Sequence, residues 1–422
     1  MTDPHGSSSI DGNASVDGTA IDAGQPYGYA RPPHLQEQFE QAAEQLRTSD
    51  GWPVEGPREL VADLALEGGG VKGIAIVGAV SVLAEAGYRF SRVAGTSAGA
   101  IAATLIAAIS RAQKPMSALK GYLDGLSFVK FMPEGKIHHF LDHDFGKAGG
   151  VLADADILSR RMGLYSGDYL AEWLTPILHD DLGVRTFADL KITLADDPGM
   201  SLPEERRYRL VVHTSDITRG ELVHLPWDYN YYGHDRDSEG VVAAVRASMS
   251  IPFFFEPVTF ECMACDVDIP QAGGGVIPTH YDAGTVTWVD GGMLRNFPID
   301  AFARIDGAPP RWPTIGIKLS SLRKSFGPTV AAATTYKLAR GCLGTMMNEW
   351  DAYSVDQSTA ARTIFVDNAG LTATDFDLTT AQQNELFLNG VRAATSFVIE
   401  MGGRGHVPRS AQEARALPDA ND

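Results

Sequence analysis

An apolar run that ends in consecutive glycines narrows the folds open to this chain more than any other feature. Residues 60–67 read as a buried strand, residues 68–70 as a glycine loop, and residues 71–86 as the helix that follows. A second apolar run, YRFSRVAG, leads into a turn at Ser97 and then into a long alanine-rich helix. Strand, loop, helix, strand, turn and helix in this order predict a parallel α/β sheet.

Composition divides the chain into three parts. Residues 1–58 begin with a stretch rich in Gly, Ser, Asp and Pro, which predicts a largely disordered region with one helix over 34–49 on the outside of the fold. Residues 59–401 are expected to form the compact domain, and residues 402–422 a loose polar tail.

Further elements are expected inside the compact domain. They are a strand hairpin over 208–225, a short helix stopped by Pro252, a strand ending at Asp290, a buried strand over 313–321 and a closing helix over 376–401.

Charge and hydropathy limit which binding partners and which cellular locations are possible. The chain has 422 residues, 44% apolar and 21% charged, as in a globular protein. Its 35 Lys and Arg against 53 Asp and Glu give a net charge of −18, which disfavours nucleic acid because phosphates require a positive surface. The first twenty residues show no signal-peptide pattern, and three cysteines cannot form a disulfide framework. We expect a cytoplasmic protein, with peripheral membrane attachment and a specialised export route left open.

The segment LSFVKFM, residues 126–132, mixes apolar and basic residues. With the nearby Lys130, Lys136, His138 and His139 it predicts either a small membrane-binding patch or a helical cap packed over the site.

Two of the three cysteines, Cys262 and Cys265, form a C-x-x-C. A zinc site would need further ligands, and only His280 lies nearby in sequence. Free thiols in a hairpin are the preferred interpretation, and no metal is expected.

A candidate nucleophile lies in the turn after the second strand. Gly95-Thr96-Ser97-Ala98-Gly99 matches G-x-S-x-G, in which a sharp strand-to-helix turn exposes a serine hydroxyl. The pentapeptide alone is a weak signal in a chain with 44 glycines. Its position between a strand and a helix strengthens it, because the helix N-terminus favours negative charge that develops at Ser97.

The glycine loop before it has two interpretations. Gly68, Gly70 and Gly73 match the G-x-G-x-x-G of dinucleotide-binding proteins, but the second strand ends without the carboxylate that holds the ribose. The alternative is an oxyanion hole, because the backbone N–H groups of a glycine loop can hold the oxygen of a tetrahedral intermediate. Parallel strands would bring this loop beside Ser97 at the carboxyl edge of the sheet.

Asp290-Gly291-Gly292 follows a later strand. Asp-Gly is a common turn pair, so the tripeptide alone means little. A strand in the same sheet would open onto the same edge as Ser97, and a partly buried aspartate there can accept the serine proton. Of the histidines, His280 precedes the strand and His406 lies in the tail, so neither is well placed as the base.

Taken together, three motifs resemble the signatures of the patatin-like phospholipase family. They are GGGVKG at 68–73, GTSAG at 95–99 and DGG at 290–292, in the family's order, and the resemblance covers about residues 60–401. The flanking segments AVRASMSIPFFFEPV and DGGMLRNFPI are similar as well. The departures are the first sixty residues and the insertion before the DGG, over 262–289, which we expect to be a surface hairpin.

The resemblance implies a three-layer α/β/α fold around a mainly parallel sheet. It also implies a lipid acyl hydrolase without a metal or other cofactor, in which Ser97 is the nucleophile, Asp290 the base and Gly68-Gly69-Gly70 the oxyanion hole. Lys72 is left with a packing role. The implied partner is a phospholipid or lysophospholipid at a membrane or micelle surface.

Two alternatives stay open. One is a non-catalytic lipid-binding or interaction module on the same fold, and the other is an enzyme that requires an activating protein partner.

Overall fold

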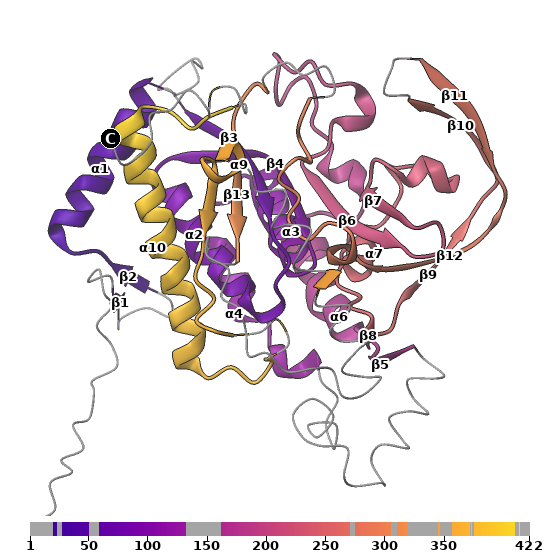
Figure 1. Ribbon diagram of the computed structural model, residues 1–422, viewed down its shortest axis with the longest axis horizontal. Coiled ribbons are helices and arrows are strands. Elements are labelled where there is room, and N and C mark those ends of the chain that lie inside the picture. Colours follow the sequence, from indigo (N-terminus) through magenta and orange to yellow (C-terminus); the bar gives the residue numbers. More distant parts are fainter. Residues whose placement is uncertain are drawn as a thin grey trace, which may run out of the picture.

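The computed structural model describes residues 20–22, 28–49, 59–131, 162–270, 275–304, 310–319, 345–346, 357–371, 373, 375–409 and 413 (Figure 1). Its helices are α1 (Pro33–Ser49), α2 (Ile74–Glu85), α3 (Ala98–Arg111), α4 (Ala118–Asp124), α6 (Asp168–Pro176), α7 (Val241–Ser248), α9 (Gln357–Ala360) and α10 (Thr380–Arg404). The short helical turns are η1 (Gly70–Gly73), η2 (Phe128–Phe131), η4 (Ile177–Asp181), η5 (Phe187–Leu190), η6 (Glu204–Arg206), η7 (Tyr229–Tyr232) and η8 (Gly291–Met293).

Most of the strands belong to one central sheet. The strands are β1 (Ala20–Asp22), β2 (Gly28–Ala30), β3 (Leu60–Leu66), β4 (Tyr88–Thr96), β5 (Gly163–Tyr165), β6 (Leu210–Asp216), β7 (Glu221–Leu225), β8 (Phe253–Phe255), β9 (Val258–Cys262), β10 (Cys265–Pro270), β11 (Val276–Tyr281), β12 (Gly284–Asp290), β13 (Thr314–Lys318) and β14 (Thr363–Phe365). The central sheet has the order β14-β13-β3-β4-β6-β12-β9, and β7 also pairs with β6. The pairs from β14 to β6 are parallel, whereas β7, β12 and β9 join antiparallel. The predicted α/β class with a mainly parallel central sheet is confirmed.

Two strands meet end to end along one edge of β6. Because β7 pairs with residues 212–216 of β6, it occupies one edge of that strand. Strand β4 pairs with residues 210–213 and β12 with residues 214–216, so both must lie along the opposite edge. Strand β4 runs parallel to β6 and β12 runs antiparallel, and therefore their carboxyl ends face each other there.

Helices α2, α3 and α7 pack against this sheet, and α10 packs along α2 (Figure 1). The contact between α2 and α10 is backbone to backbone. A Cβ on Gly78 would lie 2.1 Å from the carbonyl oxygen of Phe387, and one on Gly390 would lie 2.0 Å from that of Ala75. Glycine on each helix therefore permits this close approach.

The helix expected over 34–49 is present as α1 at the edge of the molecule (Figure 1), but one of its faces is more buried than the sequence suggested. Helix α1 packs against α10, and its Phe39, Ala42, Ala43 and Leu46 are buried. These residues follow the i, i+3, i+4, i+7 spacing of an apolar helix face, a signal obscured by the polar residues between them. Arg31, just before the helix, is also buried and forms hydrogen bonds to Glu85 and Thr395.

The C-terminal helix begins and ends later than predicted. It starts at Thr380, because Thr379 and Gln382 form a capping box, and it continues to Arg404. The loose tail expected from residue 402 is therefore ordered at its start, where Gly402 and Val407 are buried.

The insertion before β12 forms a hairpin, as expected. Strands β10 and β11 pair antiparallel with each other and project from the body of the molecule (Figure 1). Cys262 and Cys265 are free thiols, and His280 pairs with Asp266 at 2.8 Å. Among the described residues, no group of three His, Cys, Asp or Glu could hold a metal ion.

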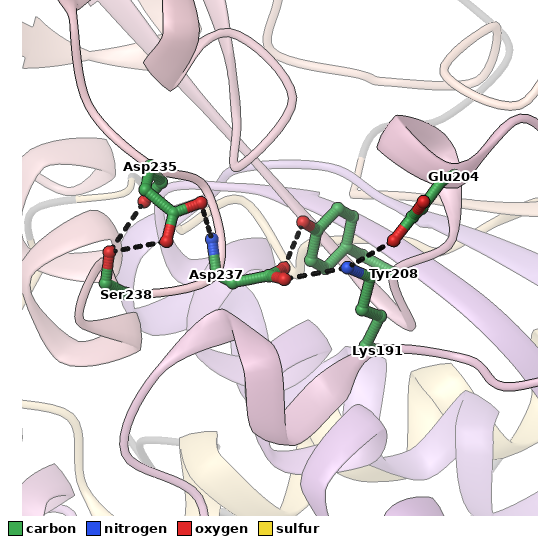
Figure 2. Close-up of polar contacts among 6 residues, drawn as sticks. All are labelled: Lys191, Glu204, Tyr208, Asp235, Asp237 and Ser238. Carbon is green, nitrogen blue, oxygen red and sulfur yellow. Dashed lines mark hydrogen bonds and ion pairs between the residues drawn. The ribbon is translucent and has the colours of Figure 1, made fainter.

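A polar cluster at the start of β6 fixes the segment that leads into α7 (Figure 2). Asp237 accepts hydrogen bonds from Lys191 at 2.7 Å and from the Tyr208 hydroxyl at 2.5 Å. Burial alone would raise the pKa of Asp237, but the hydrogen bonds from Lys191 and Tyr208 outweigh it and lower that pKa. Since α7 starts four residues later, this cluster sets the position of a helix that contacts the candidate site.

The packing of α1 leads to a stability prediction. Leu46→Ala should lower the free energy of unfolding by about 2–5 kcal/mol, because it opens a cavity between α1 and α10. Gln45→Ala, at the neighbouring exposed position, is the matched control and should change little. Urea unfolding followed by circular dichroism measures both. Equal stabilities of the two variants would show that α1 is not part of the folded core.

Candidate active site

The end of β3 is fixed by a buried ion pair. Glu67 pairs with Lys318 at the end of β13, and it also accepts a hydrogen bond from the Leu319 amide. Both charged side chains are almost fully buried. A buried pair of this kind tolerates little displacement, because either charge alone would be costly. The glycine loop thus starts from a fixed point.

Gly68 is clamped by Asn296. The Gly68 amide donates to the Asn296 carbonyl, and Asn296 Nδ2 donates to the Gly68 carbonyl, both at 3.1 Å. A Cβ on Gly68 would lie 2.3 Å from Asn296 Oδ1 and 3.0 Å from Ser97 Cβ. The first glycine of the loop is therefore packed against Ser97, and its N–H is already occupied.

The amides of Gly69 and Gly70 have no hydrogen-bond acceptor within the described part of the chain. Gly70 has a φ of +55°, and a Cβ there would lie 1.8 Å from the Ala373 carbonyl oxygen. The Ala373 carbonyl accepts the amide of Val71 at 3.3 Å. Residues far along the chain thus hold this loop in a conformation that glycine adopts most readily.

Ser97 lies in a strained turn between β4 and α3. Its φ of 54° and ψ of −125° are rarely adopted by residues other than glycine, and such strain costs about 1–3 kcal/mol. The turn is tight because Gly95 lies against the backbone of Gly99, and Gly99 lies against the backbone of Leu66. A Cβ on Gly95 would lie 2.3 Å from the Gly99 carbonyl oxygen, and one on Gly99 would lie 2.3 Å from that of Leu66. This is the backbone geometry of a nucleophile elbow.

Asp290, at the end of β12, is completely buried. Its Oδ1 accepts the Gly292 amide at 2.7 Å. Burial raises the pKa of Asp290 to about 7, although the Ser97 hydroxyl and the Gly292 amide both lower it. A carboxyl with this pKa can take up and return a proton near neutral pH.

The Ser97 hydroxyl is close enough to influence Asp290, but Asp290 Oδ2 has no direct hydrogen bond of ordinary geometry among the described residues. Catalytic hydrogen bonds are often long in the absence of substrate and tighten when it binds. The arrangement is that of a serine facing a buried acceptor.

The C-terminal end of α7 forms hydrogen bonds to the backbone of both Ser97 and Asp290. Ser248 Oγ accepts the Ser97 amide at 2.9 Å and donates to the His213 carbonyl at 2.6 Å. Two residues further on, the Ser250 carbonyl accepts the Asp290 amide at 2.9 Å. One short segment therefore fixes the backbone of Ser97 and of Asp290.

The route by which Asp290 reaches Ser97 differs from the expected one. We expected a strand that opens onto the same sheet edge as β4, but β12 is antiparallel. Thr96 pairs with His213 and Asp290 with Thr214, which are consecutive positions of β6. The two residues meet because β4 and β12 end against each other.

His213, His280 and His406 do not take the place of the base. His213 pairs with Thr96, but successive residues of a strand face opposite sides, so its ring lies on the other face from Thr214 and Asp290. The ring is buried and packs edge-on against His224. Its nitrogens make no hydrogen bond of ordinary geometry among the described residues, and burial holds its pKa well below the usual value. His280 lies on the projecting hairpin and His406 follows α10.

Sequence reasoning missed Ser248, Ser250 and Asn296. Ser248 and Ser250 belong to AVRASMSIP, where the sequence predicted a helix that ends before Pro252 but not the hydrogen bonds of these serines to the site. Asn296 follows the DGG by four residues, and no local pattern connects it to the glycine loop. Lys72 was expected to serve packing. It is half-buried, and burial lowers its pKa even though Glu67 lies nearby.

Comparison with known proteins shows the family to which the chain belongs. The model of the patatin-like phospholipase family matches residues 64–303, more than half of the chain. The uncharacterised protein YqhO of Bacillus subtilis (strain 168) is 33% identical over 336 residues, which are 80% of this chain and 97% of that protein. The chain belongs to the patatin-like phospholipase family. This family is one of lipid acyl hydrolases.

Among solved structures, VipD from Legionella pneumophila aligns over 81% of this chain and 67% of its own, with 18% identity and a TM-score of 0.38. A similarity this distant does not bear on the site.

The raised pKa of Asp290 predicts how stability depends on pH. The folded-state pKa of about 7 exceeds the ordinary value of 3.8, so the folded protein keeps a proton that the unfolded chain releases. Stability should therefore fall as pH rises from about 4 to about 7, by up to about 4 kcal/mol for about three pKa units. Asp290→Asn removes this titration and should be more stable than the wild type above neutral pH.

Urea unfolding at about pH 5 and about pH 8 measures this difference. Asp180→Asn, at an exposed position, is the matched control and should follow the wild type. If Asp290→Asn loses as much stability as the wild type between the two pH values, Asp290 is not the buried group that titrates.

Proposed function

We propose that the chain is a serine lipid acyl hydrolase of the phospholipase A or lysophospholipase type. The observation that carries the proposal is the juxtaposition of a strained serine, a buried carboxyl with a pKa near neutrality and two unoccupied loop amides. Ser97 is the nucleophile and Asp290 the base.

Acylation begins when Asp290 Oδ2 takes the hydroxyl proton of Ser97. Ser97 Oγ then forms a bond to the ester carbonyl carbon, and the carbonyl oxygen becomes an oxyanion. When this intermediate collapses, the bond to the alcohol oxygen breaks. Asp290 returns its proton to that oxygen, and the alcohol part of the lipid leaves.

Deacylation repeats the steps with water. Asp290 takes a proton from a water molecule, whose oxygen attacks the acyl carbon. The bond to Ser97 Oγ then breaks, Ser97 recovers a proton from Asp290, and the fatty acid leaves. Atoms and protons balance over these two reaction steps without a metal or other cofactor.

The oxyanion donors in this proposal are the amides of Gly69 and Gly70. Of the three glycines expected in that role, Gly68 is better described as the loop's anchor, because its amide already binds the Asn296 carbonyl. Pre-organised amides stabilise a developing oxyanion strongly, and loss of one such donor costs about 10²–10³ in rate.

A phospholipid or lysophospholipid at a membrane or micelle surface is the proposed substrate, and the chain would work in the cytoplasm as a peripheral protein. Of the predicted interfacial segment, Val129 and Lys130 are exposed, whereas Leu126 and Phe131 are buried. Lys136, His138 and His139 lie outside the described residues. None of the described helices is both long and apolar enough to cross a membrane.

A non-catalytic lipid-binding module is the second candidate, and dependence on an activating protein is a variant of the first. The burial of Asp290 beside Ser97 favours catalysis over the non-catalytic module. A buried carboxyl without an ion-pair partner lowers the stability of the fold, and such groups are concentrated at catalytic sites.

Hydrolysis of phosphatidylcholine vesicles and lysophosphatidylcholine micelles, followed by fatty-acid release, tests the function. Ser97→Ala and Asp290→Asn should each lower the rate by about 10³-fold or more. The wild-type kcat/KM should rise with pH and level off above about 7, because Asp290 must be deprotonated to act as the base.

Ser110→Ala, at the far end of α3, is the matched control and should keep full activity. Full activity in either dyad variant would refute the mechanism. Vesicle binding by a wild type that releases no fatty acid would favour the module.

A further inference from the structure

A groove starts at the candidate active site and runs between four helices. Its cavity is small, about 60 Å³, and opens to solvent, so it has room for several water molecules or a short segment of an alkyl chain. Its lining comes from the glycine loop, α2, α3, α4 and α10: Gly70, Gly73, Ile74, Val77, Ala98, Ile101, Ala102, Lys120, Leu123, Asp124, Leu126, Gln383 and Phe387.

The near end of the groove adjoins the candidate active site, although Ser97 and Asp290 do not line it. Ala98 directly follows Ser97, and Gly70 carries one of the two unoccupied loop amides. A Cβ on Gly73 would lie 3.3 Å from Ala98 Cβ, so a side chain there would narrow the space between the loop and α3. Any chain bonded to the carbon that Ser97 attacks can enter here.

The floor of the groove is apolar and its rim is polar. Val77, Ile101, Ala102 and Phe387 are almost completely buried and carry no polar side-chain atoms. The charged and amide side chains of the lining, on Lys120, Asp124 and Gln383, come from α4 and from the first turn of α10. A floor of this kind suits an alkyl chain and offers nothing to a headgroup.

The far wall belongs to α10, which lies beyond the matched residues 64–303. Its position is fixed, because Gly78 of α2 lies against the backbone of Phe387 and Gly390 against that of Ala75. The Phe387 ring is also held by Tyr29, at 6.0 Å between centroids. The wall therefore cannot retreat easily when the groove is filled.

We propose that this groove binds the acyl chain of the substrate in extended form and that Phe387 of α10 sets the length it accepts. The proposal rests on the proposed function and adds a determinant of substrate choice. The lining covers about one turn of α3, from Ala98 to Ala102, or about 6 Å at 1.5 Å per residue. A groove this short and with a rigid end discriminates between chain lengths.

Two variants change the groove in opposite ways. Ala102→Leu adds volume to the floor, and Phe387→Leu removes volume from the wall. Phe397→Leu is the matched control, because Phe397 is a buried phenylalanine of the same helix that does not line the groove. Circular dichroism confirms that each variant is folded.

The readout is kcat/KM for p-nitrophenyl butyrate, octanoate, laurate and palmitate. Ala102→Leu should lower the laurate-to-butyrate and palmitate-to-butyrate ratios by about tenfold or more, since one badly placed methylene group changes discrimination by that order. Phe387→Leu should raise the palmitate-to-octanoate ratio. Phe397→Leu should leave all ratios as in the wild type.

Unchanged ratios in both groove variants, with butyrate still hydrolysed, would overturn the proposal and leave the proposed function standing. That outcome would point to another occupant, such as a protein segment. Absence of hydrolysis of all four esters by the wild type would refute the proposed function itself. Equal shifts in Phe397→Leu and Phe387→Leu would mean that general loosening of α10, not the groove wall, controls chain length.

Discussion

Strand β6 presents one edge to two strands that arrive from opposite directions. Strand β4 occupies its first half and β12 its second, and the boundary falls between His213 and Thr214. Since neither strand can extend further without colliding with the other, both chains must turn away at this point. Ser97 and Asp290 are the residues where they turn, so the site follows from the register of the sheet.

The surrounding contacts keep that junction rigid and dry. The end of α7 binds the backbone of both residues, through Ser248 and Ser250. Asn296 fixes the glycine loop against Ser97, and the Glu67–Lys318 pair fixes the strand from which the loop starts. Burial in this frame raises the pKa of Asp290 to about 7. The same burial that makes the carboxyl costly to ionise would, in the proposed mechanism, make it a useful base near neutral pH.

The sequence could predict the parts of the site that depend on local geometry. Glycine clusters after strands, a serine before a helix and an aspartate before two glycines each have a local physical reason, and the parallel order of β3 and β4 follows from the intervening helix. The antiparallel direction of β12 could not be predicted, because it depends on the long path from β6 through α7 and the hairpin. The contact between Asn296 and Gly68 could not be predicted for the same reason, because the two residues are 228 positions apart in the sequence. The buried face of α1 was predictable in principle from Phe39, Ala42, Ala43 and Leu46, but its partner α10 was not.

In the proposed mechanism, the meeting of β4 and β12 makes Ser97 a nucleophile whose base is Asp290. Its most direct test is labelling by a fluorophosphonate, with the modified peptide mapped by mass spectrometry and the rate followed from about pH 5 to about pH 9. We predict a single adduct on Ser97 and a labelling rate that rises through about pH 7 and then levels off. An adduct elsewhere, or a labelling rate on Ser97 without a titration near pH 7, would contradict it.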